Sequence, residues 1–388
     1  MKRNALCPTP PMGWNSWNTF AEEINEALIL STADTMVESG LLAAGYNYLV
    51  IDDCWSLRQR DSQGHLVADP VKFPHGMAYV ADYVHSKGLK FGMYSCCGTR
   101  TCAGYPASFE HEFEDAKQFA QWGVDYLKYD NCYKPRSVSS ELLYHRMGMA
   151  LANCGRDIVF SACQWGTEDV HRWIRSTGAH LFRSTADIQN CWNSIRDIAV
   201  SQMDKMGYGG NYCHNDMDML VVGLYDGGGT SFIAAGGCND IEYQTHFALW
   251  AMMGSPLMIG CDIRSMSDMT KRILMNEEII AINQDVECRA PYRIEAGPME
   301  DNFVLVKHLS DGSLAIGFFN MCDTDAVVSL EFWDLGLPNL AGMGLQFHDC
   351  IEHTDLGVKQ EYFSPIVSPH GCKIYRCNLV ESHDGTPV

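Results

Sequence analysis

The sequence has few basic residues for its size, no long apolar run and no pair of cysteines at CxxC spacing. Its 28 Lys and Arg residues face 48 Asp and Glu residues, which gives a formal net charge of -20. Such an excess of negative charge disfavours binding to nucleic acid or to an anionic membrane surface. No stretch reaches the roughly 18 consecutive apolar residues that a membrane span requires. The charge therefore favours a neutral or cationic partner.

The amino-terminal segment MKRNALCPTPPMGW reaches its prolines within ten residues and contains no apolar core of a signal peptide. We therefore expect a cytoplasmic protein. The 17 cysteines are odd in number and sit in a long chain, so we expect most of them to be reduced. No His/Cys grouping has zinc-finger spacing, and we expect no structural metal.

The chain of 388 residues is long enough for two domains. Short apolar runs recur, each followed by a longer segment of helical periodicity such as 22–39 and 108–123, where Phe109, Phe113, Ala116, Phe119 and Ala120 share one face. This alternation predicts an α/β fold, a (β/α)8 TIM barrel over residues 1–289. The eight predicted strands are 11–17, 46–53, 89–95, 124–131, 157–163, 180–187, 211–216 and 255–262.

The pattern changes after residue 285, where segments 302–321 and 371–380 alternate apolar and polar residues around Gly, Asp and Ser turns. We therefore expect a carboxy-terminal antiparallel β-sandwich domain over 290–388, with fraying in its last dozen residues. The Gly-rich stretch 225–240 is expected to be a long flexible loop. It could shape a substrate entrance, form a subunit contact or be a plain insertion.

Polar and aromatic side chains follow most of the predicted strands. In a βα barrel these strand ends meet on one face, where such enzymes place their active sites. The residues are Trp14, Trp17, Asp52, Asp53, Trp55, Tyr94, Lys128, Asp130, Gln164, Trp165, Arg183, Asp187, Asp216 and Asp218.

Carboxylates combined with aromatic platforms are what sugar chemistry needs, because hydroxyls bind carboxylates and the C–H faces of a sugar stack on Trp. Hydrolysis of a glycosidic bond needs two further carboxyl groups. Taken singly, each Asp is more often a helix cap and each Trp more often packing. Their recurrence at successive strand ends is what favours catalysis. Lys128 and Asp130 share one side of a strand, as do Arg183 and Asp187 if that stretch is extended.

Ten motifs then resemble glycoside hydrolase family 27, the α-galactosidase or melibiase family. They occur in order from about residue 8 to 286: PPMGWNSWNTF, VIDDCW, KFPHGM, GLKFGMYS, TCAGYPAS, WGVDYLKYDNC, FRSTADI, NDMDMLVVG, ALWAMMGSPLMIG and IIAINQD. The resemblance implies a retaining exo-glycosidase for terminal α-D-galactosyl residues, on a barrel followed by an antiparallel β domain. It implies no metal or organic cofactor. The partner would be an α-galactoside, with homo-oligomerisation as a further possibility.

The resemblance also implies roles for single residues. Asp130 matches the nucleophile and Asp187 the acid/base, while Asp52 and Asp53 match the pair that grips the 4- and 6-hydroxyls. The other implied substrate contacts are Trp17, Tyr94, Lys128, Arg183 and Asp218, and Cys102 and Cys132 match a disulfide pair beside the site.

Residues 163–167 read CQWGT, with Trp165 beside the site. Many α-galactosidases have Glu at position 164, and many α-N-acetylgalactosaminidases have small residues at 164 and 167. Because Gln164 can bind a 2-hydroxyl and Asp53 suits a sugar with a 6-hydroxymethyl group, we expect galactose. The short Thr167 leaves an acetamido sugar as the alternative. A β-L-arabinopyranosidase and a non-catalytic galactose-binding protein are further alternatives.

Overall fold

The structure is a computed structural model that describes residues 6–296, 301–338 and 342–381. Its first part is an eight-stranded parallel sheet in the order β7-β6-β5-β4-β3-β2-β1-β8. The strands are β1 Met12–Asn15, β2 Tyr48–Val50, β3 Lys90–Cys96, β4 Tyr126–Asp130, β5 Val159–Cys163, β6 Leu181–Arg183, β7 His214–Asp216 and β8 Leu257–Ile259. This confirms the predicted (β/α)8 architecture.

The sheet is closed into a barrel by the residues that follow β7. Leu220 forms a parallel bridge with Ile259 of β8, and its amide N donates to the carbonyl of Met258 at 2.7 Å. At the β1–β2 contact, a Cβ on Gly13 would lie 2.3 Å from the carbonyl oxygen of Tyr48. Glycine at this position therefore permits the close pairing of β1 with β2.

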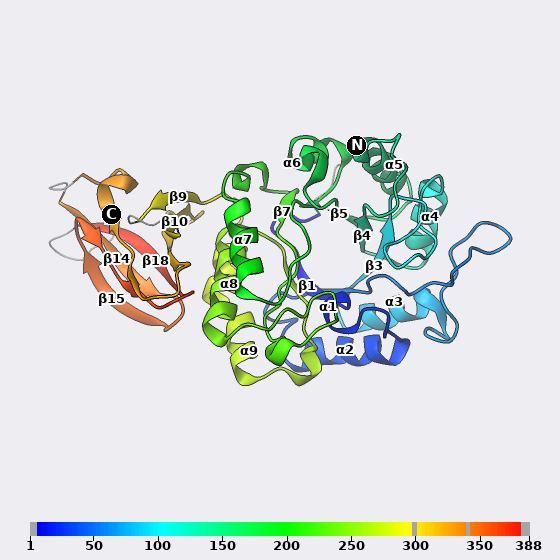
Figure 1. The fold of residues 1–388 in the computed structure, drawn as a ribbon, viewed down its shortest axis with the longest axis horizontal. Helices are drawn as coiled ribbons and strands as arrows, with labels where there is room; N and C mark the ends of the chain where they lie inside the picture. The colour runs from blue at the N-terminus through cyan, green and yellow to red at the C-terminus, as the bar shows by residue number, and fades with distance from the viewer. Residues whose placement is uncertain (1–5, 297–300, 339–341, 382–388) are drawn as a thin grey trace.

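Helices surround the sheet (Figure 1). They are α1 Trp17–Phe20, α2 Glu26–Glu38, α3 Gly76–Ser86, α4 Glu112–Gln121, α5 Ser140–Ala152, α6 Val170–Trp173, α7 Trp192–Ser201, α8 Asp240–Met252, α9 Asp268–Leu274 and α10 Glu277–Asn283. Short 3-10 turns occupy Thr167–Asp169, Ile174–Thr177, Met206–Tyr208, Tyr225–Gly227, Ile263–Ser265 and Phe332–Leu335. Among the described helices, none has the length and apolar character needed to cross a bilayer.

Two predicted helices begin later than expected. Helix α2 begins at Glu26 because the Asn25 side chain accepts a hydrogen bond from the Leu28 amide and caps it. Helix α4 begins at Glu112, and its buried stripe consists of Glu112, Asp115, Ala116 and Phe119. Phe113 lies at the edge of this stripe and is 41% exposed, so its predicted place on the buried face is wrong. Two carboxylates lie on that face instead, because each has an arginine partner: Glu112 pairs with Arg146 at 2.9 Å and Asp115 with Arg60 at 2.6 Å.

The second part is an antiparallel β domain, as predicted. Its main sheet has the order β15-β14-β18-β11-β10-β9. The strands are β9 Tyr292–Glu295, β10 Asn302–His308, β11 Leu314–Asn320, β14 Met343–Asp349, β15 Thr354–Lys359 and β18 Cys372–Glu381. Two small strand pairs, β12 Ala326–Val327 with β17 Ile366–Val367 and β13 Leu330–Glu331 with β16 Tyr362–Phe363, complete it. The proposed boundary at 289/290 falls between α10 and β9, and the residues expected to fray lie largely outside the described part, from 382 onward.

The two faces of the six-stranded sheet have different partners. One face, with Phe303, Phe319 and Ile374, belongs to the same apolar core as the barrel, and Figure 1 shows α8 between the sheet and the barrel. The other face, with Phe318 and Phe347, packs against the small strand pairs in a core of its own. The β domain therefore covers an apolar side of the barrel and leaves the carboxyl ends of the barrel strands to the loops.

Candidate active site

A cavity lies at the carboxyl ends of the barrel strands. It is lined by Trp17, Asn18, Asp52, Asp53, Tyr94, Cys102, Lys128, Asp130, Cys163, Trp165, Arg183, Asp187, Asp218, Met219, Phe232 and Ile233. A larger cavity of about 530 Å³ lies at the opposite end, lined by residues that precede β5, β6 and β7. That cavity contains none of the residues singled out from the sequence. The smaller cavity carries the carboxylates, and we take it as the candidate site.

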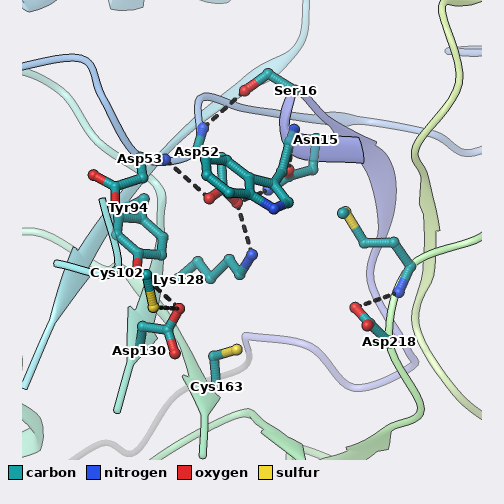
Figure 2. Close-up of polar contacts among 12 residues, drawn as sticks. Asn15, Ser16, Asp52, Asp53, Tyr94, Cys102, Lys128, Asp130, Cys163 and Asp218 are labelled. Carbon is teal, nitrogen blue, oxygen red and sulfur yellow. Dashed lines mark hydrogen bonds and ion pairs between the residues drawn. The ribbon is translucent and has the colours of Figure 1, made fainter. Parts of the chain in front are cut away.

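Asp52 follows β2 and is held on two sides (Figure 2). Its Oδ2 lies 2.7 Å from Lys128 Nζ and accepts a hydrogen bond from Asn15 Nδ2 at 2.8 Å. The Asp52 amide donates to Ser16 Oγ at 3.0 Å. Burial lowers the pKa of Lys128, but Asp52 and the other neighbouring acidic groups raise it by more, so the net shift is upward. Lys128 is therefore a firmly protonated cation between Asp52 and the cavity.

Asp53 is also buried, but it receives only neutral donors. The amides of Ala103 and Cys54 donate to its two carboxylate oxygens at 3.0 and 2.7 Å. Burial outweighs these hydrogen bonds and raises the pKa of Asp53 to about 6. Asp53 can thus change between acceptor and donor close to neutral pH.

Asp130 is the last residue of β4. Tyr94 on β3 donates its hydroxyl proton to Asp130 Oδ2 at 2.8 Å, and the Asn131 amide donates to Oδ1 at 2.8 Å. Burial raises the pKa of Asp130, and Lys128 and these hydrogen bonds oppose that shift only in part. One carboxylate with two donors and a nearby ammonium group is the arrangement expected of a positioned nucleophile.

A disulfide joins Cys102 to Cys132, two residues after Asp130. The Cys102 sulfur lies 3.6 Å from Asp130 Oδ2. In the described part of the chain, these two cysteines and Asp130 form the one group of three side chains close enough to share a metal ion. Since both sulfurs are already bonded to each other, the group is better described as a covalent clamp on the loop beside Asp130.

Arg183, at the end of β6, is shared by two carboxylates. It forms ion pairs with Asp187 and with Asp218, the latter at 2.9 Å from Nη1 to Oδ1. Desolvation raises the pKa of Asp187, but the ion pair and hydrogen bond with Arg183 lower it more. For Asp218 burial dominates over Arg183, and its pKa is raised. The Asp187 side chain is 76% exposed, so it can reach a group in the cavity mouth.

Comparison with known proteins decides what this arrangement belongs to. A family model described as "Alpha galactosidase A" matches residues 9–285. The chain belongs to the α-galactosidase family. A second model, "Alpha galactosidase C-terminal beta sandwich domain", matches residues 300–377.

Relatives within this glycoside hydrolase family match almost the whole chain. The α-galactosidase of Cyamopsis tetragonoloba is 42% identical, over 97% of this chain and 87% of its own. The α-galactosidase of Coffea arabica is 43% identical, over 96% and 94%. Among solved structures, α-galactosidase I of Mortierella vinacea is 34% identical with a TM-score of 0.88, covering 96% and 98%. The Saccharomyces cerevisiae α-galactosidase solved with raffinose is 29% identical with a TM-score of 0.88, covering 97% and 99%.

Fourteen residues received a site role from the resemblance and from segment 163–167. The structure brings eleven of them to the cavity, and Cys132, Gln164 and Thr167 do not line it. Of the other strand-end residues, Trp14, Trp55 and Asp216 do not line it either. Gln164 is fully buried, and its Nε2 donates to Thr167 Oγ1 at 2.6 Å. Its Oε1 is buried without a hydrogen-bond partner among the described residues. Gln164 and Thr167 therefore form a pair behind the cavity wall.

Five lining residues were not predicted: Asn18, Cys163, Met219, Phe232 and Ile233. Three of them, Asn18, Cys163 and Met219, are direct sequence neighbours of predicted residues, so their positions could have indicated them. Phe232 and Ile233 come from the Gly-rich stretch 225–240, where no strand end marks their position. That stretch borders the cavity, which agrees with the predicted alternative of a substrate entrance.

Proposed function

We propose that this member of the family is a retaining exo-acting α-galactosidase, with Asp130 as nucleophile and Asp187 as general acid/base. One observation carries the proposal: Asp130 and Asp187 come from different strand ends and line one cavity, each beside a cationic side chain. The raffinose bound to the yeast relative supports α-galactosides as the substrate class.

Hydrolysis would proceed in two displacements. In the first, an Asp130 oxygen attacks the anomeric carbon while the bond to the leaving oxygen breaks, and Asp187 gives its proton to that oxygen. In the second, Asp187 takes a proton from water, whose oxygen attacks the anomeric carbon and breaks the ester to Asp130. Two inversions return galactose in the α configuration.

The remaining polar residues would select the sugar. Asp52, Asp53 and Lys128 form one wall, which suits the 4- and 6-hydroxyls of galactose through charge-assisted hydrogen bonds. Trp17 offers a flat apolar surface to the C–H face. Asp53 would have no partner in an arabinopyranose, which lacks the 6-hydroxymethyl group. This argues against the β-L-arabinopyranosidase alternative.

The 2-substituent is the finer choice. Arg183 reaches the cavity and would bind a 2-hydroxyl, and behind the wall the buried Gln164 is fixed on Thr167. An acetamido group would need space on that side, so the proposal favours galactose over N-acetylgalactosamine. We further propose the cytoplasm as its compartment, because fifteen of the seventeen cysteines are free thiols and a single pair, Cys102 and Cys132, is joined in a disulfide.

The test is the initial rate on matched nitrophenyl α-galactoside, α-N-acetylgalactosaminide and β-L-arabinopyranoside. The α-galactoside should be fastest, and NMR should detect α-galactose before its mutarotation. Asp130→Asn should lose roughly 10⁴-fold in kcat with its melting temperature kept. A fast acetamido substrate would overturn the sugar assignment. First release of β-galactose, or a fully active Asp130→Asn variant, would overturn the mechanism.

A further inference from the structure

Phe232 is an exposed aromatic side chain at the edge of the cavity. It is 69% exposed, yet it lines the cavity and stacks beside Trp17, with ring centroids 6.4 Å apart and an angle of 20° between the planes. Large exposed aromatic rings that adjoin a binding cavity commonly mark a contact surface. Phe232 thus extends the aromatic wall of Trp17 outward from the sugar site.

The segment that carries Phe232 is held in place by its neighbours. The Thr230 amide donates to the Asn18 carbonyl at 2.8 Å, and the Asn190 amide donates to the Ile233 carbonyl at 2.8 Å. Ile233 is 3% exposed and anchors the chain next to Phe232. The predicted flexible loop is therefore tied to the β1 and β6 ends of the barrel, and Phe232 is presented on a supported backbone.

The same contacts place Phe232 on the side of the acid/base. Asn190 is three residues after Asp187, and its side-chain Nδ2 donates to the Leu224 carbonyl at 2.5 Å. Tyr243 of α8 donates to Asn190 Oδ1 at 2.9 Å and fixes this residue. Since Asp187 has to meet the glycosidic oxygen, the leaving group must extend from that oxygen past Asp187. Phe232 lines the same cavity as Asp187.

We propose that Phe232 is the platform on which the leaving group of the substrate stacks, and that this leaving group is a second pyranose ring. The inference rests on the proposed function, because it places the leaving group by the role of Asp187. The apolar ring of Phe232 suits the C–H face of a neutral sugar better than an anionic or cationic leaving group. Phe232 is then a specificity residue for the leaving group, distinct from the residues that hold galactose.

The experiment compares two substrates that share galactose and differ in the leaving group: melibiose, which leaves a hexose, and α-galactosyl fluoride, which leaves a single atom. Phe232→Ala should lower kcat/KM for melibiose by about 3- to 10-fold. It should leave kcat/KM for the fluoride and the inhibition constant of free galactose within about twofold of wild type. Phe232→Tyr, which keeps the ring, should retain the melibiose rate. Trp333→Ala is the matched control, because Trp333 is 65% exposed but lies in the β domain.

Each result has a definite meaning. An equal loss on both substrates, or no loss on melibiose, in a Phe232→Ala variant with wild-type melting temperature would overturn the platform. A loss in Phe232→Tyr equal to that in Phe232→Ala would also overturn it, because stacking would not be the cause. A wild type that cleaves neither substrate would overturn the proposed function itself, and this outcome is distinct because it appears before any Phe232 variant is compared.

Discussion

Arg183 forms an ion pair with Asp187 and holds the pKa of that carboxyl below its usual range. A general acid has to carry a proton in the first step, whereas a general base has to be ionised in the second. If Asp187 has the proposed role, Arg183 therefore opposes the first step and favours the second. The same guanidinium pairs with Asp218 at 2.9 Å, which fixes it between the two carboxylates.

Removing this cation should shift the acidic side of the pH profile, because the pKa of Asp187 lies below that of Asp130 and the lower of the two sets the acidic limb. In Arg183→Gln the pKa of Asp187 rises, so the acidic limb of kcat/KM should move to higher pH. Because the proposed contact of Arg183 with the substrate is also lost, kcat/KM at the optimum should fall by about 100-fold. The measurement is kcat/KM on nitrophenyl α-galactoside across pH 3 to 9. Arg196→Gln, which removes an exposed ion pair with Asp197, is the control; an unmoved limb in Arg183→Gln would refute the coupling.

Lys128 should control the basic side of the profile through Asp130, whose pKa is the higher of the two. Lys128 lowers the pKa of Asp130, which burial has raised. In Lys128→Met that opposition is lost, the pKa of Asp130 rises further, and the basic limb of kcat/KM should move to higher pH. The loss of the partner of Asp52 should cost roughly 100-fold in kcat/KM as well. Lys205→Met, on the exposed side of the barrel, should change neither quantity. A basic limb that stays in place in Lys128→Met would mean that another group controls it.

Much of the site could be predicted because parallel strands order their ends. Once the eight runs are recognised, residues such as Asp52, Asp130 and Arg183 must meet at one face, whatever their distance along the chain. The alternation of side chains along β4 also brings Lys128 and Asp130 to the same side. The fold class and most of the lining residues follow from these two regularities.

Other features depend on contacts that periodicity does not encode. The side chain of Gln164 turns to Thr167, three residues on, because a local hydrogen bond is available there. Phe232 reaches the cavity through hydrogen bonds of its loop to Asn18 and Asn190, which lie far away in the sequence. Phe113 is exposed because carboxylates with arginine partners occupy the buried stripe of α4. The placement of these three side chains could be established only from the tertiary structure.

Asp216, the last residue of β7, should make the stability of the protein depend on pH. Its side chain faces the barrel interior below the site, and Oδ1 accepts a hydrogen bond from the Asp218 amide at 2.9 Å. Burial outweighs the attraction of Arg183 and raises the pKa of Asp216 to about 6, from a reference of 3.8. Between these two pH values the folded state binds more protons than the unfolded chain. The contribution of Asp216 to the stability of the fold is therefore fully present below pH 3.8 and is lost as the pH rises through about 6.

Asp216→Asn removes this titration while keeping an acceptor for the Asp218 amide. The difference in unfolding free energy between the variant and wild type should be about 2 kcal/mol more favourable to the variant at pH 7.5 than at pH 4. Urea unfolding of both proteins at the two pH values measures the difference. Asp204→Asn, whose parent side chain is 83% exposed, should show no such dependence. If Asp216→Asn changed the unfolding free energy equally at both pH values, Asp216 would be ionised in the folded protein throughout, and Arg183 rather than burial would dominate its environment.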